Sequence, residues 1–118
     1  MARHVLLLDL KDDAEGIAAY EAWHAAGAVP AAVVASIRAA GIADMTIYRA
    51  GTRLVMLLET GPGYDPAAKA ADPATKAADP DVQAWEALMD GFQHRIAGAP
   101  GGAKWWEAAR IFALAEQP

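Results

Sequence analysis

The sequence predicts an α+β fold, in which an antiparallel sheet carries its helices on one face. Segments of strand and helix character follow one another in the order β, α (in two pieces), β, β, α, β. Two of these strands are separated only by Gly51-Thr52, a connection that is typical of an antiparallel hairpin. The chain has 118 residues, so we expect residues 1–118 to form a single domain.

The first strand and the first helix are delimited by short polar segments. Residues 4–10 form an apolar run that ends at two aspartates, as expected of a buried strand. A helix is predicted over residues 13–26. Asp12 and Glu15 resemble a capping box at its start, and Gly27 is suited to end it.

The middle of the chain predicts a second helix followed by a hairpin. The helix is expected from Pro30 to about Ala40, because proline is favoured in the first helical turn and Gly41 can close the last one. Residues 44–50 and 53–59 then have the composition of two strands. Glycine in the connecting turn accepts the positive φ that a type II′ hairpin requires.

The second half predicts a surface excursion, a long helix and a final strand. Residues 65–71 and 72–78 are near-duplicate heptads that both begin with Asp-Pro, and we expect short helical turns there. Asp79-Pro80 is predicted to start the last helix. Residues 95–104 are expected to form a loop, and Arg110–Leu114 a closing strand. The apolar stripe predicted for the last helix comprises Val82, Trp85, Leu88, Met89 and Phe92.

This order of elements is that of a ferredoxin-like fold. The sheet face without helices must be covered, and two such sheets packed face to face would cover it. We therefore predict a homodimer of the dimeric α+β barrel type.

Composition excludes several classes of function. The chain has no cysteine, which excludes disulfides and cysteine-ligated metals and fits a cytoplasmic location. The net charge of −5 and the absence of a basic cluster argue against nucleic acid as a partner. No apolar run approaches the length of about 20 residues that a membrane span needs. The three histidines are too scattered to predict a metal site.

One pair of side chains has the spacing of an acid/base site. His24 follows Tyr20 by four residues, which places the imidazole and the phenol on the same face of the first helix, together with Ile17. Histidine titrates near neutral pH, so such a pair is suited to proton transfer. On spacing alone, a histidine hydrogen-bonded at the end of its helix is the stronger interpretation.

Other aromatic and acidic residues leave alternatives open. Trp85 belongs to a core stripe, and packing is the first interpretation for it; Glu86 beside it is either solvated or binds a hydroxyl group. Trp105-Trp106 either closes a pocket or covers the end of the sheet. Strand alternation separates Asp44 and Tyr48 from Met45 and Ile47, without telling which face meets a ligand.

Taken in order, several segments resemble the L-rhamnose mutarotase family, and the resemblance covers nearly the whole chain. It implies a dimeric ferredoxin-like protein that interconverts the α and β anomers of a 6-deoxy-L-sugar without metal or redox cofactor. The segments are Tyr20–His24, Ser36–Ile42, Asp44–Arg49, Val82–Met89 and Arg110–Leu114.

The resemblance also implies roles for individual residues. The proton-transferring histidine of the family falls on His24 and a substrate-binding tyrosine on Tyr20. Further substrate contacts fall on Met45 and on the pair Trp85 and Glu86, where the rhamnose enzymes carry a tyrosine and two tryptophans. These two changes look more like the L-fucose branch, which makes L-fucose the first expected substrate and L-rhamnose the second.

Two other classes of function stay open at this stage. One is a cofactorless monooxygenase-like enzyme on the same dimeric barrel, for which the Tyr20–His24 pair and the two adjacent tryptophans would also be suited. The other is a noncatalytic sugar-binding dimer. It is favoured by Val29-Pro30-Ala31, which stands where the family usually has Trp-Pro-Glu.

Overall fold

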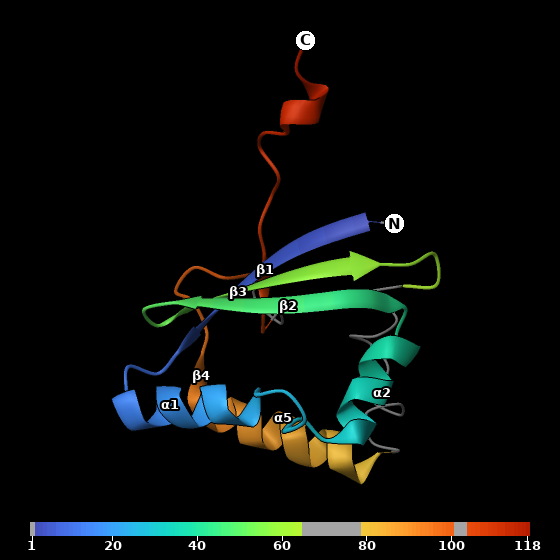
Figure 1. Ribbon diagram of the computed structural model, residues 1–118. Coiled ribbons are helices and arrows are strands. Elements are labelled where there is room, and N and C mark those ends of the chain that lie inside the picture. Colours follow the sequence, from blue (N-terminus) through green and yellow to red (C-terminus); the bar gives the residue numbers. More distant parts are fainter. Residues whose placement is uncertain (1, 65–78, 101–103) are drawn as a thin grey trace.

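The computed structural model describes residues 2–64, 79–100 and 104–118. Among these, a strand, two helices and a hairpin come first, and a long helix and two very short strands follow (Figure 1). The predicted heptads over residues 65–78 lie outside the described residues. In chain order the elements are β1 (Ala2–Leu10), α1 (Ala14–Trp23), α2 (Ala31–Ala39), β2 (Ile42–Ala50), β3 (Arg53–Thr60), α5 (Pro80–Phe92), β4 (Gln93–His94), β5 (Trp106–Glu107) and the 3₁₀ turn η1 (Leu114–Glu116).

The sheet is antiparallel, with the strand order β2-β3-β1-β4, and β5 also pairs with β1. This is the order of a ferredoxin-like fold, so the predicted fold class is confirmed. The long ladder between β1 and β3 places Leu8 opposite Leu54, close to the end at which β3 begins. On the other edge of β1, two short segments share the place of one strand. β4 pairs with Leu10 and Asp9, and β5 pairs with Leu7 and Leu6.

All three helices cover one face of the sheet, which we call the inner face (Figure 1). Alternation along β1 and β3 directs Leu8, Leu10, Leu54 and Leu58 to this face, and all four are buried. Leu10 and Leu54 form a core cluster with Tyr20 of α1 and Met89 of α5. Ile17, Ile47, Trp85, Leu88, Phe92 and Trp105 pack around this cluster.

The helix ends agree with the predictions for α2 and α5, and differ for α1. The Asp79 carboxylate accepts hydrogen bonds from the backbone N–H groups of Asp81 and Val82, which caps α5. In α1 the N-cap is Asp13 and not Asp12, and its side chain makes no capping bond, so the predicted capping box is wrong. The helix also ends at Trp23, three residues earlier than predicted, because a turn follows that leads to Gly27 with a φ of +81°.

The predicted closing strand Arg110–Leu114 is wrong. The chain pairs with β1 earlier, at Trp106–Glu107, and the Ala108 N–H still donates to the Val5 carbonyl before the chain leaves the sheet. A strand needs a partner edge, and residues 110–113 have none within the described chain. Residues 109–118, which we call the C-terminal arm, extend away from the body of the molecule (Figure 1). Their apolar side chains are therefore exposed, Ile111 by 96% and Leu114 by 77%.

None of the helices described in the three ranges is long and apolar enough to cross a membrane.

Candidate active site

His24 lies at the C-terminal end of α1, where the helix ladder stops. Its Nδ1 is 2.7 Å from the backbone carbonyl oxygen of Tyr20, one turn earlier. A carbonyl oxygen can only accept, so Nδ1 must carry the hydrogen of this bond. The neutral ring therefore has its lone pair on Nε2, which is the atom that can take up and return a proton.

Tyr20 supports this imidazole from one side. The two rings are stacked with their centroids 4.2 Å apart and a tilt of 35°. Tyr20 is 3% exposed, and its hydroxyl accepts a hydrogen bond of 3.3 Å from Nε2 of Gln93. Burial raises the pKa of the Tyr20 phenol, and the bond from Gln93 lowers it by less. The phenol thus keeps its proton at neutral pH and can donate it in a further hydrogen bond.

Trp85 closes another side of the imidazole. Its ring meets that of His24 edge to face, with centroids 5.3 Å apart and planes at 65°. Trp23 in turn contacts Trp85 with a centroid separation of 6.3 Å. Because Trp85 comes from α5 and His24 from α1, the packing of these two helices assembles the site.

The ion pair between Glu21 of α1 and Arg49 of β2 joins the helix of the site to the sheet. Arg49 also donates a hydrogen bond of 2.8 Å to the Gly51 carbonyl in the hairpin turn. Arg49, Ile47 and Met45 alternate along β2, so Met45 also faces the helices, whereas Asp44 and Tyr48 face away. Met45 therefore lies on the same side of the sheet as His24.

Glu86 has a different environment from Trp85. Its carboxylate lies 3.5 Å from Nζ of Lys104, which also contacts Asp90 at 2.5 Å. Glu86 and Asp90 are one turn apart on α5, so one lysine bridges both carboxylates. The structure therefore brings Tyr20, His24 and Trp85 into contact, and it pairs Glu86 with Lys104.

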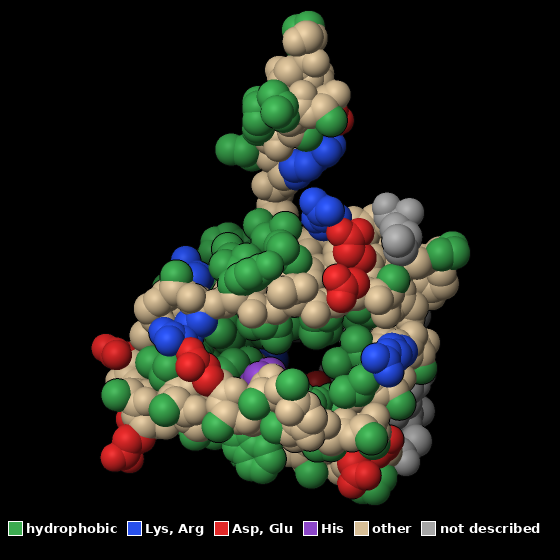
Figure 2. Space-filling model, in the orientation of Figure 1, with side chains coloured by type: hydrophobic (Ala, Val, Ile, Leu, Met, Phe, Trp, Pro, Cys, Tyr) green, Lys and Arg blue, Asp and Glu red, His purple; other side chains and the backbone are tan. Residues whose placement is uncertain are grey.

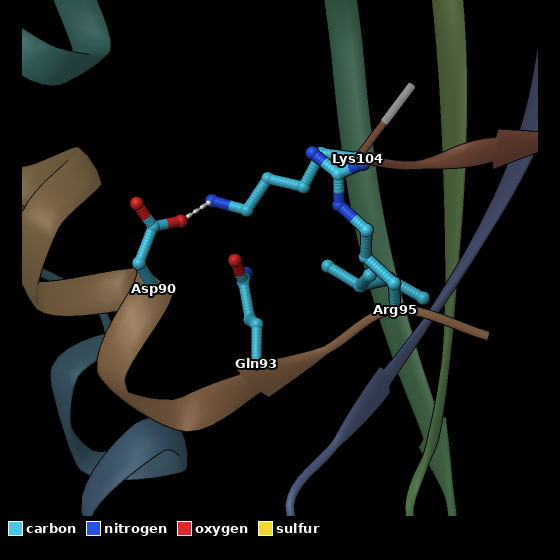
Figure 3. A pocket seen from close by; sticks show the side chains of 5 residues that line it. Asp90, Gln93, Arg95 and Lys104 are labelled. Atoms are coloured by element: carbon cyan, nitrogen blue, oxygen red, sulfur yellow. Dashed lines mark ion pairs between the residues drawn. The ribbon is translucent and has the colours of Figure 1, made fainter. Parts of the chain in front are cut away.

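A polar cavity of about 290 Å³ adjoins Gln93, whose side chain donates to the Tyr20 hydroxyl; Tyr20, His24 and Trp85 do not line it. Figure 2 shows that the molecule is hollowed between the sheet and the helices, with a histidine side chain at the edge of the opening. The volume is just below the range of about 300–1,000 Å³ for small-molecule sites, which fits a small ligand such as a monosaccharide. The cavity is lined by Leu8, Asp90, Gln93, Arg95 and Lys104 (Figure 3).

Sequence reasoning missed Gln93 and Lys104. Gln93 follows directly on α5 and begins β4, where it pairs with the buried Leu10 and therefore faces inward. The sequence offered only one indication of Gln93, which is that a polar residue directly follows the apolar stripe of the last helix. Lys104 stands before Trp105, which packs against the core cluster, while Trp106 is in β5. Of the two adjacent tryptophans, Trp105 thus packs against the core cluster, whereas Trp106 belongs to the strand that pairs with β1.

The other two histidines lie elsewhere. His94 pairs with Asp9 in the sheet, on the opposite face from Gln93, and is exposed. His4 binds Glu107 through Nδ1 at 3.0 Å and lies 5.6 Å, between ring centroids, from Tyr64. Within the described part of the chain, no group of three or more histidines and carboxylates could hold a metal ion.

The strand order and the helices on one face of the sheet define an α+β barrel protein, with the His24 imidazole on the helix-covered side. The family described as L-rhamnose mutarotase matches residues 3–114. An L-fucose mutarotase from Xanthomonas campestris pv. campestris is 55% identical over 116 residues, which are 98% of this chain and 90% of the relative. The chain belongs to the L-rhamnose mutarotase family, and the predicted class of enzyme, an isomerase that interconverts sugar anomers, is confirmed.

Solved structures agree on the fold. The L-rhamnose mutarotase of Formosa agariphila superimposes with a TM-score of 0.64 at 12% identity, covering 97% of this chain and 99% of that one. Tetracenomycin F2 cyclase from Streptomyces glaucescens, a type-II polyketide cyclase, gives a TM-score of 0.55 at 18% identity, with 96% of each chain covered. The fold alone therefore does not choose between sugar and polyketide chemistry. The family match makes that choice.

Proposed function

We propose that this protein interconverts the α and β anomers of L-fucose, with L-rhamnose as its second substrate. The observation that carries this proposal is the 55% identity with an L-fucose mutarotase along almost the whole chain. Met45 and Glu86 agree with it, because they differ from the residues that the resemblance leads us to expect in a rhamnose enzyme.

We assign the proton transfer to Nε2 of His24. In the opening step a proton leaves the anomeric hydroxyl and another reaches the ring oxygen, while the bond between C1 and the ring oxygen breaks. Rotation about C1–C2 exposes the other face of the aldehyde, and the reverse transfers close the ring. His24 supplies one of these transfers, and water, Tyr20 or Glu86 supplies the other. A positioned acid/base of this kind contributes about 10²–10⁴-fold.

In this proposal the residues around His24 orient its imidazole or contact the sugar. Tyr20 orients the imidazole by stacking and presents a phenolic hydrogen. Trp85 offers an apolar ring against which a face of the sugar can stack. Met45 and Glu86 are assigned to substrate contacts beside them. The inward position of Met45 and the ion pair of Glu86 with Lys104 support this assignment.

Saturation-transfer NMR between sugar anomers tests the function. L-fucose, L-rhamnose and two D-hexoses are compared at equal concentration, with and without protein. We expect the largest acceleration of exchange for L-fucose and a smaller one for L-rhamnose. Acceleration of none of them would refute the mutarotase proposal. Saturable binding of fucose without faster exchange would instead identify a noncatalytic sugar-binding protein, and oxygen consumption with an aromatic substrate a monooxygenase.

We also propose that the protein is a homodimer and works in the cytoplasm. The outer face of the sheet, opposite the helices, supports the dimer because it is apolar in the middle. Val5 pairs there with Leu57, and Leu7 with Val55. Figure 2 shows apolar side chains gathered on the sheet and on the C-terminal arm. A monomer would leave this surface in water, which is uncommon for an apolar patch of this kind.

The C-terminal arm gives a test of the dimer. We expect a solution mass of twice the 12.4 kDa of one chain by light scattering. Replacing both Ile111 and Leu114 with aspartate should shift the mass toward that of a monomer, because charges on the arm cannot be buried between subunits. Gln117→Ala on the same arm serves as the control. A wild-type mass of one chain would contradict this proposal.

A further inference from the structure

We propose that Gln93 binds a hydroxyl group of the sugar, and so acts as a specificity-determining residue of the active site. This inference rests on the proposed mutarotase function. It starts from the two ends of the Gln93 amide, which have different environments. Nε2 donates to the Tyr20 hydroxyl at 3.3 Å, whereas Oε1 is buried and has no hydrogen-bond partner among the described residues.

A buried acceptor without a partner is rare, because leaving it unpaired costs free energy. In binding sites the missing partner is commonly the ligand. Gln93 is also held in place by its backbone, which pairs with Leu10 in the sheet and directs the side chain to the inner face. The unpaired atom therefore belongs to a residue with a fixed position and not to a loose surface chain.

The surroundings of Gln93 suit a polyhydroxylated ligand. Gln93 lines the cavity of about 290 Å³, and Figure 3 shows its side chain reaching toward the space between Asp90 and Lys104. The ion pair of those two residues, together with Arg95, gives this space a polar wall. The terminal torsion of glutamine is broad, so a small rotation of the amide, with Nε2 still within reach of the Tyr20 hydroxyl, can direct Oε1 toward a hydroxyl that enters the cavity.

Gln93 also connects this cavity to the acid/base residue. Its Nε2 holds the Tyr20 hydroxyl, and the Tyr20 ring stacks on His24. A sugar bound at Oε1 is therefore fixed relative to the imidazole through two side chains. Such a contact rejects sugars that lack the hydroxyl, because the amide oxygen would then stay buried and unpaired.

Sugar analogues that lack single hydroxyl groups test this proposal. Wild type, Gln93→Met and Gln83→Met are compared by anomer exchange, with the sugar that the wild type accelerates most and with its analogues deoxygenated at C2, C3 or C4. Gln83 is exposed on α5, so its variant is a matched control. We expect Gln93→Met to lower kcat/KM for the parent sugar by about 10–100-fold. One analogue should lack the hydroxyl that Gln93 binds. For that analogue Gln93→Met should lower kcat/KM by less than about threefold, because the contact is already absent in the wild type.

Two outcomes would overturn the proposal while the wild type remains active. One is a change of less than about twofold in Gln93→Met for the parent sugar. The other is an equal loss for the parent and all analogues, which would assign Gln93 only to the support of Tyr20. If Gln93→Met does not fold by circular dichroism, Gln93→Glu replaces it. Glutamate has an oxygen acceptor on a side chain of the same size. Gln93→Glu should therefore keep the wild-type ratio of kcat/KM between the parent sugar and the analogue that lacks the contacted hydroxyl. An inactive wild type would refute the proposed function itself, which separates the two failures.

Discussion

Replacing His24 with asparagine is expected to slow enzyme-catalysed anomer exchange of L-fucose by about 10²–10⁴-fold. Asparagine keeps a polar side chain at the end of α1 but cannot exchange a proton at neutral pH. Exchange rates from saturation-transfer NMR at saturating sugar measure the loss directly. We expect a smaller change in KM, because Trp85 and the cavity lined by Gln93 remain in place.

The matched control is His94→Asn. His94 is exposed on the opposite face of the sheet, so this variant should keep the wild-type rate. A His24→Asn protein with a normal circular dichroism spectrum and full activity would show that the proton transfer belongs to another group. Equal losses in both histidine variants would point to an effect on the fold and not on catalysis.

Replacing Leu54 with alanine is expected to lower the free energy of unfolding by about 2–5 kcal/mol. Leu54 is 1% exposed, lies opposite Leu8 in the sheet and belongs to the core cluster with Tyr20 and Met89. Truncation leaves a cavity at the point where the sheet and two helices meet. The loss is a large share of the stability of about 5–15 kcal/mol that is usual for a domain.

Urea unfolding followed by tryptophan fluorescence measures this loss. All variants are compared at one protein concentration, because assembly of a dimer would contribute to the apparent stability. Leu54→Met is the control, since a swap that conserves volume costs less than about 1.5 kcal/mol. A loss below about 1 kcal/mol in Leu54→Ala would contradict the tight enclosure of this side chain.

Local patterns were sufficient to predict most of the fold. The apolar run of β1, the hairpin glycine between β2 and β3, and the Asp-Pro start of α5 each act within a few residues, so the sequence shows them directly. The C-terminal arm shows the opposite case. Residues 110–114 have strand composition, but a strand also needs an edge of the sheet. The edge of β1 beside them is already paired with β4 and β5.

The site could be predicted only in part, for a similar reason. The spacing of Tyr20 and His24 is a property of one helix, and their stacking followed from it. The contacts with Trp85 and Gln93 join segments more than 60 positions apart, and only the packing of α1 against α5 and β4 creates them. The family resemblance supplied Trp85, whereas Gln93 had no comparable signal.

The hydrogen bond between His24 and the Tyr20 carbonyl has a consequence for how the enzyme loses activity. Many enzymes fix the tautomer of such an imidazole with a carboxylate, whereas here the last turn of α1 does so. Helix ends open more readily than whole domains unfold. When this turn frays on warming, Nδ1 loses its acceptor and the ring is free to rotate. Catalytic activity should therefore decline at temperatures where the sheet is still intact, so that heat inactivation reports on one helical turn and not on the global fold.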